Sequence, residues 1–171
     1  LDADAREIKV EEFVPPQIRV KAVPPKADSR ASTNLIFTVS GEHMFGGPAK
    51  GLPAEGAYMF EDAPFAPRGW EGFRFGDENR RLQPNFTTTK RARLDADGRA
   101  DFVASFSSKL CPRAAVKLTV QGCVFEGGGR PAAARASTIV HAYPYYIGVA
   151  LPETLRHGTS PRVCRVVMVN P

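Results

Sequence analysis

The side chains best suited to catalysis lie far apart along this sequence, in no familiar catalytic spacing. The histidines are His43, His141 and His157, and none has a carboxylate or thiol neighbour in a pattern that activates a nucleophile. The sequence also lacks a Gly-x-Ser-x-Gly elbow, a phosphate-binding loop and a His-Glu-x-x-His motif. A Cys/His or Ser/His pair assembled by folding stays open, but we predict no catalytic and no cofactor-binding residue, and hence no enzyme.

The cysteines do not have the spacing of a metal site. Cys111, Cys123 and Cys164 contain no Cys-x-x-Cys pair, so a zinc centre is not expected. Cys111 and Cys123 flank one predicted strand, whose rise of about 3.3 Å per residue holds them too far apart for a disulfide. Cys164 could pair with either of them or stay free. At least one thiol is therefore expected to be free.

Residues 95–98 (DADG) resemble the start of a calcium-binding loop. Such a loop needs glycine at its sixth position and glutamate at its twelfth, where this chain has Ala100 and Phe106. The Asp-Gly dipeptide is instead typical of a turn between two strands, because glycine adopts positive φ without strain. We predict a hairpin here and no metal site. Residues 85–87 (NFT) have the form of a glycosylation sequon, which is a weak signal.

The charge distribution is uneven along the chain. Residues 1–78 carry 9 Lys and Arg against 13 Asp and Glu, whereas residues 79–171 carry 14 against 5. A basic half is compatible with nucleic-acid binding. Its cations are dispersed, however, and few aromatic residues lie between them as a stacking platform would require. We therefore interpret them as solvated strand faces; they include Arg91, Arg93, Arg99, Arg113, Lys117 and Arg135.

Hydrophobic residues alternate with a period of two, and almost nowhere with the helical period. The chain has 171 residues, 43% of them hydrophobic, with 15 Gly and 15 Pro, which disfavours long helices. We predict an all-β fold, a seven-stranded antiparallel β-sandwich with extra flanking strands. The expected strands are residues 8–14, 18–22, 35–40, 57–61, 86–94, 99–106, 116–124, 132–142, 145–151 and 162–169.

Residues 46–84 form a long segment rich in Gly, Pro and aromatic side chains. Its aromatic residues could anchor a ligand, since aromatic residues on loops often do; they include Phe60, Phe65, Trp70, Phe73 and Phe75. They could equally plug one end of the sandwich. The second interpretation is favoured, because no cluster of polar groups converges there.

Several short motifs occur in one order over nearly the whole chain. They are residues 10–15 (VEEFVP) before 18–20 (IRV), 44–52 (MFGGPAKGL), 69–76 (GWEGFRFG), 94–100 (LDADGRA), 125–131 (FEGGGRP) and 145–149 (YYIGV). In this order and spacing the chain resembles an interior macroglobulin domain of the bacterial alpha-2-macroglobulins. The resemblance implies three parts: residues 1–16 as the last strand and linker of a preceding domain, 17–142 as one complete sandwich, and 143–171 as the start of another.

The resemblance also implies a function. Members of that family are periplasmic protease-trapping inhibitors, often lipoproteins tethered to the inner membrane, and many form a covalent bond through a thioester. The thioester motif Cys-x-Glu-Gln is absent from this sequence, and no bait-like segment is evident. We therefore expect a non-catalytic structural domain whose partners are neighbouring domains of one polypeptide, with target proteases bound by the whole protein. No contact with nucleic acid or membrane is expected. The absence of an initial Met and of a signal peptide predicts a piece of a longer, exported protein.

Two further interpretations remain. On the family hypothesis, Arg19, Lys21, Arg91 and Arg93 are solvated faces or domain contacts. The alternative function is a stand-alone extracellular β-sandwich that binds carbohydrate or a host surface through the loop around Trp70 and Phe73.

Overall fold

The fold was analysed in a computed structural model, which describes residues 17–31, 34–107, 110–128, 131–150 and 164–171. The predicted strand at residues 8–14, His157 and the beginning of the strand predicted at 162–169 lie outside these ranges. The described regular structure consists of β-strands alone. They are β1 Ile18–Val23, β2 Ser29–Arg30, β3 Leu35–His43, β4 Pro53–Ala63, β5 Arg74–Phe75, β6 Thr87–Thr88, β7 Ala92–Arg93, β8 Arg99–Ala104, β9 Ala115–Phe125, β10 Pro131–His141, β11 Tyr146–Ala150 and β12 Arg165–Val169.

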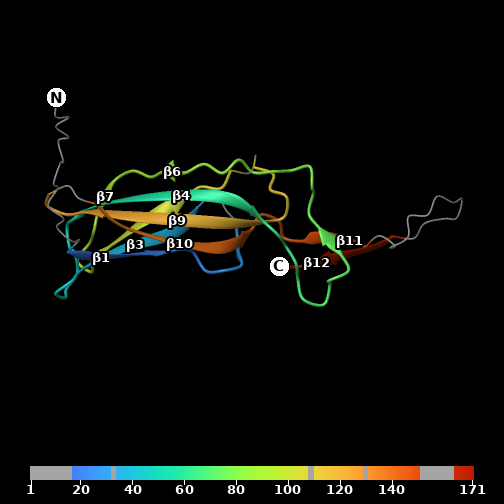
Figure 1. Cartoon of the computed structure of the whole chain (residues 1–171), viewed down its shortest axis with the longest axis horizontal. Helices are drawn as coiled ribbons and strands as arrows, with labels where there is room; N and C mark the ends of the chain where they lie inside the picture. The colour runs from blue at the N-terminus through green and yellow to red at the C-terminus, as the bar shows by residue number, and fades with distance from the viewer. Residues whose placement is uncertain (1–16, 32–33, 108–109, 129–130, 151–163) are drawn as a thin grey trace, which may run out of the picture.

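Two sheets stack face to face to form a β-sandwich (Figure 1). One sheet has the order β1-β3-β8, and the other has the order β2-β10-β9-β4-β6, with β7 also paired to β4. All long neighbours are antiparallel, and the two residues of β2 add a short parallel pairing to the end of β10. The prediction of an all-β sandwich is confirmed.

Two of the predicted strands differ most from the structure. The strand expected at residues 57–61 is the longer β4, which has 11 residues. It pairs along most of its length with β9, so ladder hydrogen bonds support Ala and Gly residues of low β-propensity. The strand expected at 86–94 is divided into β6 and β7. Between them, Thr89 bonds to Gly56 of β4 through its backbone amide, which donates to the Gly56 carbonyl at 2.8 Å, and through its side chain. Its hydroxyl donates to the Gly56 carbonyl at 2.9 Å and accepts from the Gly56 amide at 3.1 Å.

The core lies between the two sheets and is closely packed around a pair of glycines. Phe37 of β3 is 1% exposed, and its ring stacks on Phe102 of β8 with centroids 5.6 Å apart. Gly56 of β4 and Gly122 of β9 are directly opposite each other in the other sheet. A Cβ at Gly56 would lie 2.8 Å from Phe37, and one at Gly122 would lie 2.5 Å from Val39. The two glycines therefore provide the space that the large side chains of β3 occupy.

The Asp-Gly turn is confirmed, but the predicted hairpin is wrong, because β7 pairs with β4 in one sheet and β8 pairs with β3 in the other. Gly98 has φ of +70°, and its amide donates to the Asp95 carbonyl at 3.1 Å. One Asp95 carboxylate oxygen accepts the amides of Asp97 and Arg99, each at 2.9 Å. This carboxylate thus stabilises the turn, as an Asx-type residue does.

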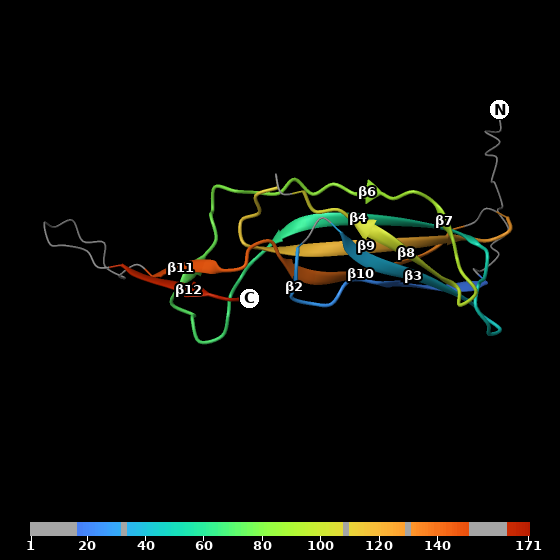
Figure 2. The ribbon, with the colours of Figure 1, turned by 180° about the vertical axis from the view of Figure 1, so that it is seen from behind.

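A third, small sheet lies at one end of the sandwich (Figure 2). Its order is β12-β11-β5, with all pairings antiparallel. The sequence predicted the two C-terminal strands but gave them no third partner. That partner, β5, comes from the aromatic segment between β4 and β6, more than sixty residues earlier in the chain. Within the described residues, no helix has the length and apolar character needed to span a membrane.

Candidate interdomain junction

Stacked aromatic rings connect the sandwich to the C-terminal strands. Phe65, just after β4, stacks on Tyr146 of β11 with ring centroids 4.0 Å apart and an interplanar angle of 20°. Phe75 of β5 meets Phe65 edge-on at 5.3 Å. Phe75 also covers Gly148 of β11, where a Cβ would lie 2.5 Å from the ring. A glycine on β11 therefore allows the aromatic segment to approach closely and add β5 to the sheet.

A buried histidine crosslinks three segments at the same place. His141, the last residue of β10, is 4% exposed. Its Nδ1 lies 2.9 Å from the Tyr146 hydroxyl, and its Nε2 lies 3.2 Å from an Asp28 carboxylate oxygen. A neutral ring satisfies both contacts when the Tyr146 hydroxyl donates to Nδ1 and the Nε2–H donates to Asp28. Asp28 has φ of +58°, and its amide donates to Ile139 of β10 at 3.0 Å.

Tyr143 lies between His141 and Tyr146 and adds a second polar connection. Its hydroxyl donates to the Pro112 carbonyl at 3.0 Å, which links residues 142–145 to the segment before β9. The side-chain hydrogen bond between Tyr143 and Arg80 is the main cause that raises the pKa of the Arg80 guanidinium. The electrostatic interaction with nearby Cys111 raises this pKa further. The linker between the sandwich and β11 is therefore held by the Tyr143 hydrogen bond, and by the contact between His141 and Tyr146 at its two ends.

The remaining aromatic residues of the loop face the C-terminal strands and not the sandwich core. Trp70 meets Phe73 edge-on at 5.3 Å, and the Arg165 guanidinium of β12 lies 5.3 Å from the Phe73 ring centroid. Neither ring belongs to the buried cluster of the sandwich, and neither do those of Phe65 and Phe75. The interpretation of this segment as a plug is therefore wrong for these four rings, and it holds for Phe60, which is 8% exposed in the sandwich core. The four rings form a contact between two parts of the chain instead.

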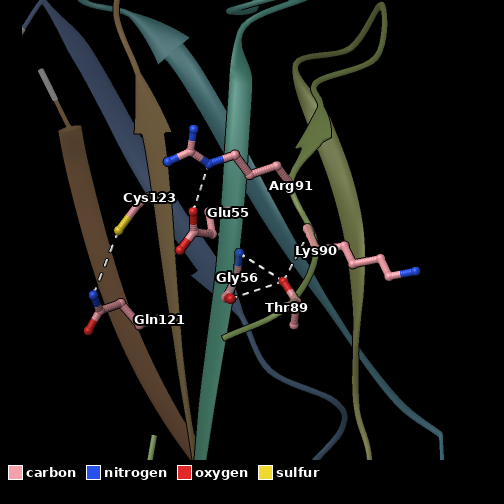
Figure 3. Close-up of polar contacts among 7 residues, drawn as sticks. All are labelled: Glu55, Gly56, Thr89, Lys90, Arg91, Gln121 and Cys123. Atoms are coloured by element: carbon pink, nitrogen blue, oxygen red, sulfur yellow. Dashed lines mark hydrogen bonds and ion pairs between the residues drawn. The ribbon is translucent and has the colours of Figure 1, made fainter. Parts of the chain in front are cut away.

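The structure does not bring the other chemically capable residues together into one site. His43 is exposed at the end of β3, far along the sandwich from His141. Cys111 and Cys164 are exposed and Cys123 is half-buried, and all three are free thiols. Figure 3 shows Cys123 beside Gln121, whose Nε2 lies 3.7 Å from the sulfur. Among the described residues, no group of three or more His, Cys, Asp or Glu could hold a metal ion.

The basic residues of the second half are distributed over the surface, and several are paired. Arg91 contacts Glu55 at 3.0 Å, as Figure 3 shows, and Lys117 contacts Glu61 at 3.3 Å. Arg135 donates to Gln121 at 2.6 Å and lies over the Phe86 ring. These contacts place the cations on a sheet face with local partners.

The pH dependence of stability tests the buried Tyr146 contact. Burial raises the pKa of Tyr146 to about 12, against about 10 in an unfolded chain. Its contribution to stability is therefore complete below about pH 10 and is lost as pH rises towards about 12. We expect Tyr146→Phe to be less stable by about 0.5–1.5 kcal/mol at neutral pH, because the bond to His141 is lost, and to show a weaker alkaline decline.

Urea unfolding at pH 7 and at alkaline pH measures both effects. The matched control is Tyr145→Phe, because Tyr145 is 51% exposed. This control should follow the wild-type curve at both pH values. Identical alkaline declines in the wild type and Tyr146→Phe would show that the Tyr146 hydroxyl does not contribute as described.

A family model described as "Bacterial Alpha-2-macroglobulin MG5 domain" matches residues 17–141. The alpha-2-macroglobulin of Xylella fastidiosa (strain Temecula1 / ATCC 700964) is 26% identical over 144 residues, 83% of this chain and 9% of that protein. The alpha-2-macroglobulin of Escherichia coli (strain K12) is 26% identical over 131 residues, 77% of this chain and 8% of that protein.

Solved structures show a similar fold. Trypsin-activated alpha-2-macroglobulin from Escherichia coli has a TM-score of 0.63 at 24% identity, covering 83% of this chain and 10% of its own. The native conformation of the Escherichia coli protein has a TM-score of 0.59 at 22% identity, covering 94% of this chain and 11% of its own. The chain thus spans about a tenth of the length of the proteins that it matches.

Proposed function

Because the chain belongs to the family of bacterial alpha-2-macroglobulin MG5 domains, we propose that it is a non-catalytic structural domain of a protease-trapping protein. Its partners are neighbouring domains of one polypeptide, and target proteases are bound by the whole protein. We place that protein in the periplasm, tethered to the inner membrane. The observation that carries the proposal is the junction, where a loop of the sandwich pairs with the C-terminal strands.

We also propose a division of the chain into three parts. Residues 17–142 are the complete sandwich, 143–171 begin a following β-domain, and 1–16 end a preceding one. In support, the sandwich and the third sheet have separate ladders, and β5 is the strand through which they meet. A domain boundary normally lies in a flexible linker that few contacts cross. This boundary is crossed by stacked rings and by the His141 hydrogen bonds, so we infer a rigid connection.

A rigid connection gives the domain its mechanical role. A protease trap must convert a local cleavage into movement of whole domains, and coupling through packed side chains transmits such movement better than a loose linker does. Two kinds of contact hold the sandwich and the C-terminal strands together. Phe65 stacks on Tyr146, and the Tyr146 hydroxyl is hydrogen-bonded to His141. A displacement of the C-terminal strands therefore moves the sandwich with them.

Trapping of trypsin by the full-length polypeptide tests the proposed function. We expect the full-length protein to retain trypsin that still cleaves a small peptide substrate but cleaves a large protein substrate poorly. The isolated chain of residues 1–171 should leave both activities unchanged, because it supplies structure and no inhibitory site. Inhibition by the isolated chain would contradict a purely structural role. A full-length protein that retains no protease would contradict the assignment to a trap.

A further inference from the structure

The turn between β3 and β4 exposes two large apolar side chains to solvent. Phe45 at its tip is 98% exposed, and the adjacent Met44 is 55% exposed. Single exposed apolar residues are ordinary, but an almost completely exposed phenylalanine beside a methionine has the composition of an interface anchor. This turn lies at the opposite end of the sandwich from β11 and β12 (Figure 1). It is therefore separate from the aromatic junction.

The turn is held in one conformation by backbone hydrogen bonds. The His43 amide donates to the Gly47 carbonyl and the Gly46 amide donates to the His43 carbonyl, both at 2.9 Å. Gly46 and Gly47 have φ of +93° and +90°, which side chains other than glycine rarely adopt. Phe45 is therefore presented at a fixed position. Such preorganisation lowers the entropy cost of binding a partner.

A cavity of about 480 Å³ lies at the base of the same turn. Ile18 and Leu52 contribute apolar surface, and His43 and Glu126 contribute polar groups. A partner that docks at this end of the sandwich can receive the protruding Phe45 ring and insert a side chain of its own into the cavity. Gln17 forms part of the cavity wall, and its amide donates to Glu126 at 2.7 Å.

The position of Gln17 identifies the partner. The Met44 amide donates to the Gln17 carbonyl at 2.8 Å, so the polypeptide that precedes Gln17 is joined to the chain beside the exposed turn. Any domain before Gln17 is thereby tethered within reach of Phe45, and tethering raises its effective concentration to the millimolar range. At such concentrations a small apolar contact is enough for stable docking.

We propose that Phe45 and Met44 anchor the sandwich to the domain that precedes Gln17 in the polypeptide. The Phe45 ring enters an apolar pocket of that domain, and a side chain of that domain enters the cavity beside Ile18 and Leu52. This inference rests on the proposed function, which requires a preceding domain. It adds a second rigid contact, so that the sandwich is fixed to its neighbours at both ends.

A single reporter indole tests the anchor. Trp70 is the one tryptophan of residues 1–171, so Phe45→Trp combined with Trp70→Phe leaves one indole among them, at position 45. In the full-length polypeptide its emission is the difference from the Trp70→Phe parent. In residues 1–171 alone, the F45W indole should emit at the wavelength of a fully exposed tryptophan and be readily quenched by acrylamide. In the full-length polypeptide we expect a blue shift and a several-fold weaker quenching, both independent of protein concentration.

The control is Ile36→Trp in the same Trp70→Phe background, because Ile36 is 56% exposed on β3 away from the turn. Its quenching should be equal in the two proteins.

The outcomes separate the anchor from the proposed function. Equal exposure of the F45W indole in both proteins overturns the anchor, and it leaves the function intact when the same full-length protein retains trypsin. A blue shift that grows with concentration in residues 1–171 alone assigns the surface to a second copy and also overturns the proposal. As a second measurement, Phe45→Ser in the full-length protein should raise amide exchange in residues 42–48 to the level of the isolated chain. Unchanged exchange would likewise contradict the anchor.

Discussion

Replacing Phe37 with alanine is expected to lower the free energy of unfolding by about 3–5 kcal/mol. The side chain is 1% exposed and lies between Phe102 of its own sheet and Gly56 of the opposite sheet. Truncation removes apolar contacts on both sides. The cavity cannot collapse easily, because the glycine backbone opposite has no side chain to move into it. Urea unfolding of residues 1–171, monitored by far-ultraviolet circular dichroism, measures the change.

Ile36 supplies the matched control for this experiment. It is the preceding residue of β3, points to the other face of the sheet and is 56% exposed. We expect Ile36→Ala to change stability by no more than about 0.5 kcal/mol. If Phe37→Ala and Ile36→Ala lowered the free energy of unfolding by similar amounts, the inner face of β3 would not be packed in the core of the sandwich.

Replacing Phe65 with alanine is expected to destabilise the junction by about 2–3 kcal/mol while leaving the sandwich folded. The ring stacks on Tyr146 and contacts Phe75 and His141, so its loss opens the aromatic contact between β5 and β11. Native-state hydrogen exchange distinguishes the two regions. Amides of β11 and β12 should exchange faster, by the factor that corresponds to the destabilisation of the junction. The exchange rates of amides in β9 and β10 should stay the same.

The control for Phe65→Ala is Ile147→Ala on the opposite face of β11. Ile147 is 63% exposed, and its register partner Met168 is 68% exposed, so truncation removes little packing within the chain. Exchange in β11 should then resemble the wild type. Two outcomes would contradict a junction that is distinct from the core. One is equally faster amide exchange of β11 in both variants, and the other is unfolding of the whole sandwich in Phe65→Ala.

Strands with strict alternation were predictable from the sequence. Leu35, Phe37 and Val39 are buried and alternate with the less buried Ile36, Thr38 and Ser40, because each face of a strand meets one environment. The Asp-Gly turn was also predictable, since its conformation depends on local residues. The family resemblance placed the chain correctly because its motifs are turns and loops of this kind.

The contacts between distant segments could not be predicted from local patterns. Gly56 and Gly122 are separated by more than sixty residues, and their role arises when β4 and β9 pair and meet the side chains of β3. Phe65 and Phe75 gave an aromatic signal, but the identity of their partner depends on where β11 lies in space. Gly148 was one signal in the sequence for this partner, because a ring can approach a strand closely only where the strand has no side chain.

The candidate site was therefore recognised as aromatic but assigned to the wrong neighbour. The sequence interpretation placed the loop against its own sandwich, because no cluster of polar groups converges on the loop in the sequence. His141 was considered as a catalytic candidate and is instead a buried crosslink between β10, β11 and the turn at Asp28. No sequence motif marks this role, since it depends on a tyrosine five residues later and a carboxylate more than a hundred residues earlier.

Protease trapping by a full-length polypeptide with a weakened junction tests the central claim most directly. The measurement is the fraction of trypsin retained in a form that cleaves a small peptide substrate and not a large protein, for the wild type, Phe65→Ala and Ile147→Ala. If this domain transmits movement through its aromatic junction, Phe65→Ala retains several-fold less trypsin although its sandwich is folded, and Ile147→Ala equals the wild type. Wild-type retention by Phe65→Ala, with faster amide exchange in β11 proving that the junction is open, would contradict the claim.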